Sequence, residues 1–473
     1  MPRTFICSLS LVGLALFSIT GRPLAAQEAA IGTAEPDAAT VFLIPETDEG
    51  LPGAGPIRRY DWMKRTWQLR RSTFASRATR DRQAVVFLGD SITQGWGESF
   101  QDDFAGMKVA NRGISGDTTR GMLIRLQADV LNLNPAAVVM LMGTNDLEEA
   151  AEPPVIAGNV KLILETMKQH DPDMPIVLCQ VMPSSAAKKR SSEDIRMLNE
   201  WLADVVRGDS QVTLVDTWTL FANADGDAKK EEFPDLLHPN RAGYLKWKAA
   251  LLPVFATLGF VETRADDFQV EPGFESLFNG TDLTGWEYRP TPDAMRSSRE
   301  RWMSRKPKGI VWPLVEKRVS LEGKSSTPDG RYVAKAGRLV VTTPPEGRKI
   351  QQLWTTRDFD GDFTLRLEFR ATPNADSGVF LRGTQLQCRD FALAGPYKDL
   401  KDYRPQQWNE LEVVVSGNVA RCSCNGEVIE AAFELPDTGP IGLEGDRGQM
   451  EYRRIRTTAI APERPEGPTA PCR

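Results

Sequence analysis

Residues 84–96, AVVFLGDSITQGW, decide the fold of the first half of the chain. The stretch begins with five uninterrupted apolar residues, which is typical of a strand buried on both faces in a parallel sheet. Gly89, Asp90 and Ser91 follow as a predicted turn into a helix. Ser91 therefore lies where the carboxyl end of a strand meets a helix start, the place where ligands and catalytic groups collect in open α/β sheets. The serine can also act only as a helix N-cap, so this stretch alone leaves its role open.

Strands and helices alternate around this stretch. Residues 60–80 have helical spacing and predict a helix against the sheet edge. Further apolar strand patterns occur at residues 108–111, 137–142, 175–182 and 212–216. Two helices between them each place four apolar residues on one face: Ile156, Val160, Ile163 and Met167 in one, and Ile195, Leu198, Leu202 and Val206 in the other. This alternation predicts a doubly wound parallel sheet with helices on both faces, a flavodoxin-like three-layer α/β fold.

The candidate chemistry lies in loops after these strands. Glycines in the loop at residues 111–116, NRGISG, allow the backbone to approach a bound group closely. The chain has only two histidines, and His170 closes a predicted helix, where a structural role is common. His238 is then the one histidine left to act as a general base for Ser91. Asp235 precedes it by one turn and can hold the other ring nitrogen.

Four sequence blocks together resemble a known family. GDS at 89–91, the loop around Gly113, GTND at 143–146 and D-x-x-H at 235–238 are similar, in order, to the signature blocks of SGNH (GDSL-type) esterases and acylhydrolases. The resemblance covers residues 58–257. It implies that Ser91 is the nucleophile, His238 the base and Asp235 its orienting partner. It also implies an oxyanion hole built from the backbone N–H groups of Ser91 and Gly113 and the side-chain amide of Asn145. We expect no metal or other cofactor, because the two histidines are far apart and leave no recognisable ligand cluster.

The second half of the chain has a different pattern. A polar stretch near residues 263–272 carries no periodicity and predicts a linker. Beyond it, apolar and polar residues alternate, most clearly at 363–370 and 411–415, as expected for half-buried strands. Asn-Gly at 425–426 and Gly-Asn at 417–418 mark hairpin turns. These features predict an antiparallel β-sandwich, with residues 290–335 as a long insertion near one sheet edge.

This half also resembles a family. Segments such as FNG at 278–280, LTGW at 283–286, NADSGVFLR at 374–382 and PIGL at 440–443 are similar to the 3-keto-disaccharide hydrolase domain, which implies a concanavalin-like jelly roll over residues 274–460. As a sugar-binding module, the domain would offer three tryptophans as stacking platforms: Trp286, Trp354 and Trp408. As a second hydrolase, it would need a carboxylate, for which the candidates by position and type are Glu368, Asp376 and Asp390. The sequence leaves both interpretations open.

The remaining expectations concern the termini, the cysteines and the surface. A short basic start and an apolar run predict a signal peptide at 1–26. The other expected segments outside the two domains are a disordered leader at 27–57, a linker at 258–273 and a tail at 461–473. Five cysteines remain after export, and Cys388 could pair with Cys422 or Cys424. A net charge of −6 argues against nucleic-acid binding. No segment after the signal is long and apolar enough to span a membrane.

The sequence therefore predicts an exported serine esterase, periplasmic or extracellular, that hydrolyses carboxylic esters. We expect its substrates to be small-molecule or polysaccharide esters, with acetyl groups on carbohydrates favoured by the second domain. The alternatives are a short-chain lipid or thioester acylhydrolase, and a carbohydrate-binding protein whose second domain is the active glycoside-processing enzyme.

Overall fold

A computed structural model describes residues 42–261, 267–304, 314–342 and 351–459. The expected signal peptide at 1–26, the first part of the leader and the tail at 461–473 lie outside the described residues. Within the described ranges, no helix is both long and apolar enough to cross a bilayer.

The first domain is built on a five-stranded parallel sheet with the order β2-β1-β3-β4-β5. This is the flavodoxin-like order, as the sequence predicts. Its strands are β1 (Val85–Gly89), β2 (Val109–Gly113), β3 (Ala137–Leu141), β4 (Ile176–Cys179) and β5 (Val212–Val215). Its helices are α1 (Asp61–Ser76), α2 (Ala78–Asp81), α3 (Ser91–Gln94), α4 (Phe100–Asp103), α5 (Thr119–Asp129), α6 (Thr144–Glu148), α7 (Pro153–His170), α8 (Ser192–Val205), α9 (Thr217–Phe221) and α10 (Arg241–Leu258).

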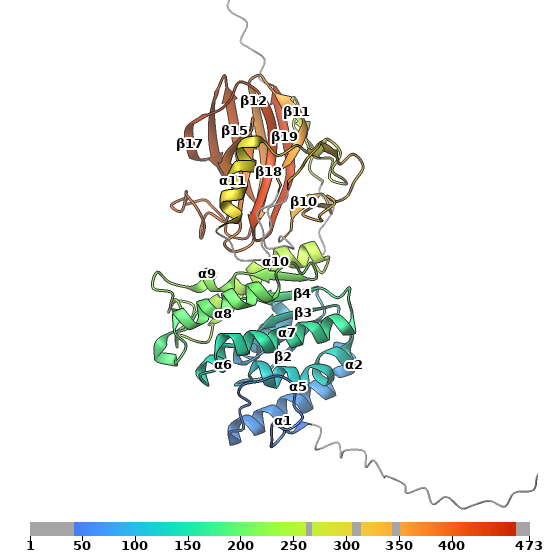
Figure 1. Cartoon of the computed structure of the whole chain (residues 1–473), viewed down its shortest axis with the longest axis vertical. Coiled ribbons are helices and arrows are strands. Elements are labelled where there is room, and N and C mark those ends of the chain that lie inside the picture. Colours follow the sequence, from blue (N-terminus) through green and yellow to red (C-terminus); the bar gives the residue numbers. More distant parts are fainter. Residues whose placement is uncertain (1–41, 262–266, 305–313, 343–350, 460–473) are drawn as a thin grey trace, which may run out of the picture. The chain divides into compact units, whose positions relative to one another are not determined.

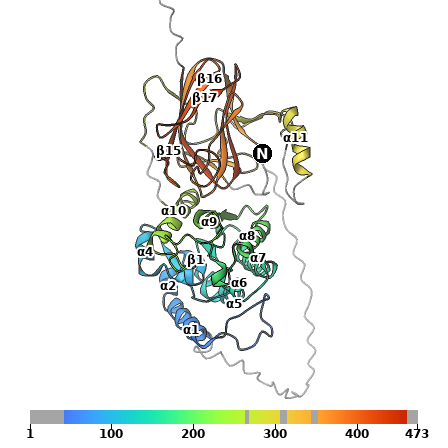
Figure 2. The same ribbon diagram turned by 90° about the vertical axis from the view of Figure 1, so that its left-hand side faces the viewer.

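Helices cover both faces of this sheet (Figures 1 and 2). Alternate residues of β1 point to opposite faces, so Val86 and Leu88 pack against α5, α7 and α8, whereas Phe87 packs against α4 and α10. Figure 2 shows β1 between α10 and α4 on one side and α6, α7 and α8 on the other. Both predicted apolar faces, on α7 and on α8, are buried in this core.

Residues 42–57 differ from the expected disordered leader. Ile44 is buried and packs with Met63 and Trp67 of α1. The backbone N–H of Ala54 donates to Asn159 Oδ1 at 3.0 Å. Composition suggested disorder because the stretch is rich in small and polar residues. Composition does not reveal these contacts, because their partners lie elsewhere in the sequence. The segment is therefore an ordered part of the first domain.

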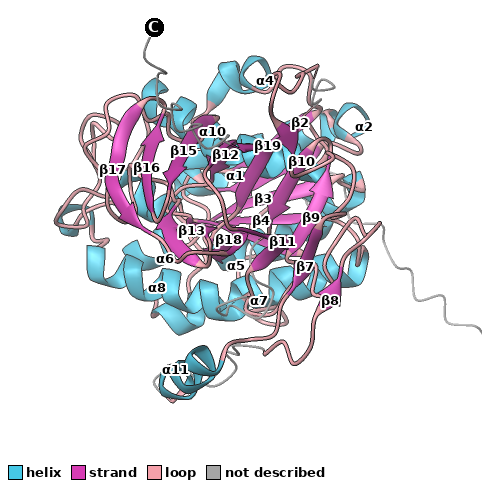
Figure 3. Ribbon diagram, turned by 90° about the horizontal axis from the view of Figure 1, so that it is seen from above, coloured by secondary structure: helices cyan, strands magenta, loops and turns pink. Residues whose placement is uncertain are grey.

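The second domain consists of two antiparallel sheets. One has the order β17-β16-β15-β12-β19-β10-β9, with β6 paired to β19, and the other has the order β14-β13-β18-β11-β7-β8. Figure 3 shows β15, β16 and β17 as neighbouring strands of the larger sheet. The strands are β6 (Glu275–Ser276), β7 (Trp286–Tyr288), β8 (Val319–Ser320), β9 (Tyr332–Lys335), β10 (Arg338–Val341), β11 (Leu353–Phe359), β12 (Phe363–Ala371), β13 (Asp376–Leu381), β14 (Thr384–Gln387), β15 (Asn409–Ser416), β16 (Val419–Cys424), β17 (Glu427–Glu434), β18 (Gly439–Arg447) and β19 (Met450–Ala459).

The core of this domain lies between the two sheets, as in a jelly-roll sandwich. The alternating residues Phe363, Leu365 and Leu367 of β12 are buried there with Leu443 of β18. The predicted insertion at 290–335 carries α11 (Asp293–Met303) and supplies the edge strands β8 and β9.

The four described cysteines, Cys179, Cys388, Cys422 and Cys424, are free and buried. The disulfide considered for Cys388 is therefore absent from the described residues, and these thiols serve as small apolar core groups.

Candidate active site

Ser91 is held at the end of β1 by a tightly packed turn. A Cβ on Gly89 would lie 2.7 Å from the carbonyl oxygen of Leu141 in β3, so only glycine fits there. Asp90 caps α3, because its Oδ1 accepts a hydrogen bond from the Ile92 N–H at 2.9 Å. The Tyr244 hydroxyl on α10 donates to the Ile92 carbonyl at 2.8 Å. Ser91 is thus the first residue of α3, and Asp90, not Ser91, is the N-cap.

The three residues expected to form a catalytic triad come together. His238 Nε2 lies 3.0 Å from Ser91 Oγ, and His238 Nδ1 lies 2.8 Å from Asp235 Oδ2. Ser91 and His238 are 147 residues apart in sequence. Ser91 follows the carboxyl end of β1, and His238 lies in the loop that leads into α10. One ring nitrogen therefore contacts the candidate nucleophile and the other contacts a carboxylate, the arrangement of a serine hydrolase.

The loop around Asp235 fixes this carboxylate. Its Oδ1 accepts hydrogen bonds from the backbone N–H groups of Leu237, at 3.0 Å, and His238, at 2.7 Å. Burial raises the pKa of Asp235, but these bonds and the bond from the His238 ring outweigh it and hold the pKa at about 2. Asp235 is therefore ionised at neutral pH and can stabilise a proton on His238.

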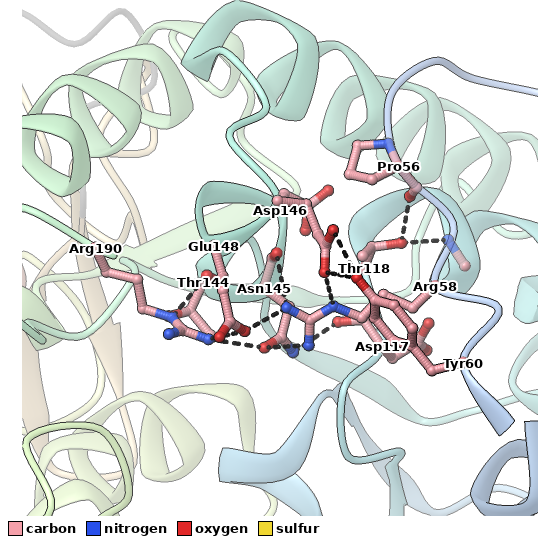
Figure 4. Close-up of polar contacts among 12 residues, drawn as sticks. Pro56, Arg58, Tyr60, Asp117, Thr118, Thr144, Asn145, Asp146, Glu148 and Arg190 are labelled. Atoms are coloured by element: carbon pink, nitrogen blue, oxygen red, sulfur yellow. Dashed lines mark hydrogen bonds and ion pairs between the residues drawn. The ribbon is translucent and has the colours of Figure 1, made fainter. Parts of the chain in front are cut away.

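Asn145 is held on three sides, as Figure 4 shows. Its Nδ2 donates to the carbonyl oxygen of Asp117 at 2.9 Å. Its Oδ1 accepts hydrogen bonds from Arg58 Nη1 at 3.2 Å and Arg190 Nη2 at 3.1 Å. Two cationic donors on Oδ1 fix which end of the amide is oxygen. One proton on Nδ2 then remains for another acceptor.

Sequence reasoning missed these two arginines. Arg58 precedes α1 and lies 87 residues from Asn145, and Arg190 precedes α8 and lies 45 residues away. Both are almost fully buried, at 7% and 2% exposed. Glu148 pairs with both of them, through Arg58 Nη2 and, at 2.7 Å, through Arg190 Nη2. No local pattern indicates this cluster, because its members meet only in the folded chain.

A hollow of about 440 Å³ opens beside the same cluster. Glu148 lines it together with Leu147, residues 150–153 leading into α7 and residues of the 186–194 segment. Its size is in the range of small-molecule pockets. The carboxylate that binds both arginines is therefore also part of a surface that a ligand can reach.

Gly113 does not have the free N–H that the expected oxyanion hole requires. Its N–H donates to Asn111 Oδ1 at 2.9 Å. A Cβ at this position would lie 2.3 Å from Gln94 N, so the glycine allows β2 to pack against α3. The structure therefore gives Gly113 a packing role, which a glycine-rich loop in a sequence cannot distinguish from a donor role.

Gly116, three residues further on, is placed differently. The preceding Ser115 N–H donates to Gln94 Oε1 at 2.7 Å, and the following Asp117 N–H donates to Ile114 O at 3.1 Å. In the described part of the chain, no acceptor is assigned to the N–H of Gly116 or to that of Ser91. Gly116 also adjoins Asp117, whose carbonyl contacts Asn145.

Three carboxyl groups are fully buried beneath the site. Burial raises the pKa of Asp90 to about 6, that of Asp117 to about 7 and that of Asp146 to about 6. Arg125 opposes the shift at Asp117 with a 2.7 Å ion pair, and Thr119 opposes it at Asp146 with hydrogen bonds. The pKa values of the three carboxyl groups therefore lie above that of a free aspartate, and their hydrogen bonds and ion pair brace the loops that carry Ser91 and Asn145.

The tryptophans proposed as platforms in the second domain do not form one site. Trp286 is fully buried, and its Nε1 donates to the Leu277 carbonyl at 2.8 Å. Trp354 packs edge-on against Phe380. Trp408 carries two guanidinium groups on its ring, 4.8 Å and 4.1 Å from the centroid. The three indoles are therefore engaged in packing or covered by cations.

The candidate carboxylates of the second domain are also paired. Glu368 binds Arg453 at 2.6 Å and Arg454 at 2.7 Å, and Asp376 binds Arg389 at 2.8 Å. Asp390 is fully buried, accepts hydrogen bonds from Asn374 N–H, Tyr403 and Gln406, and has a pKa raised by burial to about 6. Each of the three carboxylates thus has its own ion-pair or hydrogen-bond partners, and these contacts do not place any two of them together as a catalytic pair.

Comparison with known proteins finds a family match in each half of the chain. Residues 87–246 match the GDSL-like lipase/acylhydrolase family. Residues 273–458 match the 3-keto-alpha-glucoside-1,2-lyase-like domain. The two matches coincide with the parallel-sheet domain and the β-sandwich, respectively.

Individual relatives resemble the first half. The bovine platelet-activating factor acetylhydrolase IB subunit alpha1 is 27% identical over 181 residues, 38% of this chain and 77% of the relative. The human alpha2 subunit is 28% identical over 183 residues, 38% of this chain and 79% of the relative. A GDSL-like lipase structure from Bacteroides thetaiotaomicron is 25% identical, with a TM-score of 0.36, and covers 40% of this chain and 98% of its own. The parallel-sheet domain thus matches the GDSL-like lipase/acylhydrolase family of ester-bond hydrolases, and the β-sandwich matches the 3-keto-alpha-glucoside-1,2-lyase-like domain.

Proposed function

We propose that this protein is an exported serine esterase that removes acyl groups, chiefly acetyl, from carbohydrates. The observation that carries the mechanism is His238, whose two ring nitrogens contact Ser91 Oγ and Asp235 Oδ2. Membership of an acylhydrolase family agrees with this geometry.

The reaction proceeds in two steps. His238 takes the proton of Ser91 Oγ as the oxygen attacks the ester carbonyl, and the protonated ring then gives that proton to the departing alcohol. The resulting acyl-enzyme is attacked by water, which His238 deprotonates, and Ser91 regains the proton as the acid leaves. Asp235 keeps the ring oriented and stabilises its positive charge in both steps.

The negative charge on the carbonyl oxygen needs fixed donors. We assign this role to the Ser91 N–H, the remaining proton of Asn145 Nδ2 and the Gly116 N–H. Gly116 replaces the expected Gly113, because the Gly113 N–H already donates to Asn111 Oδ1. Gly116 directly precedes Asp117, whose carbonyl holds the amide of Asn145.

Two observations support the choice of substrate. The relatives named acetylhydrolases favour a short acyl group. The second domain matches a family named after a glucoside, which favours a sugar as the alcohol part of the ester. The pairing of two domains in one chain is an association and not a site argument, so a direct assay decides the alcohol part.

The test is acetate release from an acetylated polysaccharide by the full-length protein, with 4-nitrophenyl acetate as a small-ester control and Ser91→Ala beside both. We expect Ser91-dependent release from both substrates. Activity on the small ester alone would remove the carbohydrate assignment and favour a lipid or thioester acyl group. Loss of neither activity in Ser91→Ala would overturn the serine mechanism.

Export has its own test. The predicted signal at residues 1–26 implies a mature chain that begins near Gln27. Amino-terminal sequencing of the protein recovered from the periplasm or medium of an expressing bacterium should return that residue. Recovery of the uncleaved chain in the cytoplasm would contradict export.

A further inference from the structure

Two large aromatic side chains are exposed side by side at the start of the first domain. Tyr60 is 51% exposed and Trp62 is 44% exposed. Their rings are nearly parallel, with 6.3 Å between the centroids and 16° between the planes. Exposed aromatic rings of this size are costly to leave in water, and grouped ones commonly mark a binding surface.

The pair lies against the candidate oxyanion loop. A Cβ on Gly116 would lie 2.4 Å from Trp62 Cη2, which means that the edge of the indole touches the α-carbon of this glycine. The φ angle of Gly116 is +83°, a second reason for glycine. Ser115, next to it, is bound to Gln94, the last residue of the helix that starts at Ser91. Trp62 therefore borders the loop next to the nucleophile.

The aromatic pair also has a polar rim. The Tyr60 hydroxyl donates to the Glu149 carboxylate, with both oxygens at 3.2 Å. Arg58 Nε donates to Glu149 Oε1 at 2.7 Å, and the same guanidinium reaches Asn145 (Figure 4). Glu149 is partly exposed, so its oxygens can also accept hydrogen bonds from a ligand.

A flat apolar surface with hydroxyl acceptors at its edge matches the chemistry of a sugar ring. One face of a pyranose presents C–H groups, which pack on an aromatic ring, while its hydroxyls donate to carboxylates and carbonyls. A lipid chain would gain from the aromatic rings but would leave the Glu149 carboxylate unused. The combination favours the sugar.

We propose that Tyr60 and Trp62, with Glu149 at their edge, form the subsite that binds the sugar ring of an acylated carbohydrate. This inference rests on the proposed function and specifies where the alcohol part of the ester lies. It gives the first domain its own carbohydrate recognition, independent of the second domain.

The experiment compares Trp62→Ala with Trp201→Ala, a tryptophan on α8 that is equally exposed at 44%. For each variant, kcat/KM is measured on an acetylated oligosaccharide and on 4-nitrophenyl acetate. We expect Trp62→Ala to lower the ratio of the two values about 10-fold, mainly through KM for the oligosaccharide, the loss expected for one aromatic contact. Trp62→Tyr should restore most of it, and Trp201→Ala should leave the ratio unchanged.

Equal losses on both substrates would mean that Trp62 only supports the loop, and no loss on either substrate would mean that no sugar binds there. Either result overturns the subsite. A second measurement does not depend on turnover: calorimetric titration of the oligosaccharide into Ser91→Ala, with and without Trp62→Ala. Weaker binding in the double variant supports the subsite even if the esterase proposal fails, whereas equal or absent binding rejects it.

Discussion

The candidate residues of the two domains differ in how they are satisfied. In the first domain, Ser91 and His238 contact each other and remain partly open to solvent. In the second domain, Glu368 and Asp376 are bound by arginines and Asp390 is sealed in the core. A reactive group must have one partner that activates it and one side free for substrate, whereas a fully paired group is a structural element. Residue type is the same in both cases, and only the contacts separate them.

The largest expected effect tests this difference directly. Ser91→Ala and His238→Ala should each lower kcat for ester hydrolysis by at least about 1,000-fold, because removing either member disables the nucleophile. Glu368→Gln in the second domain should leave hydrolysis unchanged. The measurement is steady-state kinetics on 4-nitrophenyl acetate, with melting temperature as the check on folding. A comparable loss of kcat in Glu368→Gln would contradict this assignment, because it would place part of the ester hydrolysis in the second domain.

Asn145→Ala should come next, with a loss of roughly 100- to 1,000-fold in kcat, the usual result of removing one oxyanion donor. The KM should change little, since the donor acts on charge that develops in the transition state. Near-normal turnover in a folded variant would remove Asn145 from the mechanism.

The arginines that hold Asn145 should give a smaller effect. Arg58→Met removes one of the three contacts that position the Asn145 amide. We expect kcat to fall by about 10- to 100-fold, as it does when catalytic groups are slightly misplaced. The matched control is Arg59→Met, because Arg59 is the neighbouring arginine but binds Pro45 and Asp48 instead.

A double-variant cycle separates positioning from general destabilisation. If Arg58 acts through the amide, Arg58→Met should cause little further loss of kcat in the Asn145→Ala background. Additive losses would show that the guanidinium serves another purpose, such as holding Glu148 and Glu149.

The smallest effect concerns pH and stability. Burial raises the pKa of both Asp90 and Asp390 to about 6, so between about pH 4 and 6 the folded protein keeps protons that the unfolded chain has lost. The free energy of unfolding should therefore fall as pH rises through this window, by an amount on the order of 1–3 kcal/mol per group. Urea unfolding of Asp390→Asn should show a flatter slope than the parent protein.

Replacing aspartate by asparagine at position 90 or at position 390 distinguishes the two domains. Asp90→Asn should flatten the pH slope and also change kcat, because Asp90 caps the helix that carries Ser91. Asp390→Asn should flatten the slope without changing kcat. A change of kcat in Asp390→Asn would contradict the structural role given to that carboxyl.

Several parts of the fold and site were accessible from the sequence because they depend on local spacing. The apolar faces of α7 and α8 and the alternation along β12 follow from the helix and strand periods. Asp235 and His238 are three residues apart, so one short loop brings them together. With only two histidines in the chain, the base for Ser91 was almost determined by elimination.

Other parts depended on partners far away in sequence. Residues 42–57 are ordered by contacts with α1 and α7. Arg58 contacts Asn145, and Glu368 pairs with Arg453. Each of these contacts joins segments that only the folded chain brings together. Gly113 shows the same limit within one loop, since its N–H went to the side chain of Asn111 and left Gly116 as the candidate donor.

The sequence by itself thus predicted the strands and helices of the two folds, because periodicity is a property of the local chain. The resemblance of its short blocks to known families added the jelly roll and the candidate serine, histidine and aspartate. Only the tertiary structure decided which polar groups are already satisfied and which remain open to a substrate. That outcome depends on which strands become neighbours and which loops meet at their ends, and no local pattern specifies it.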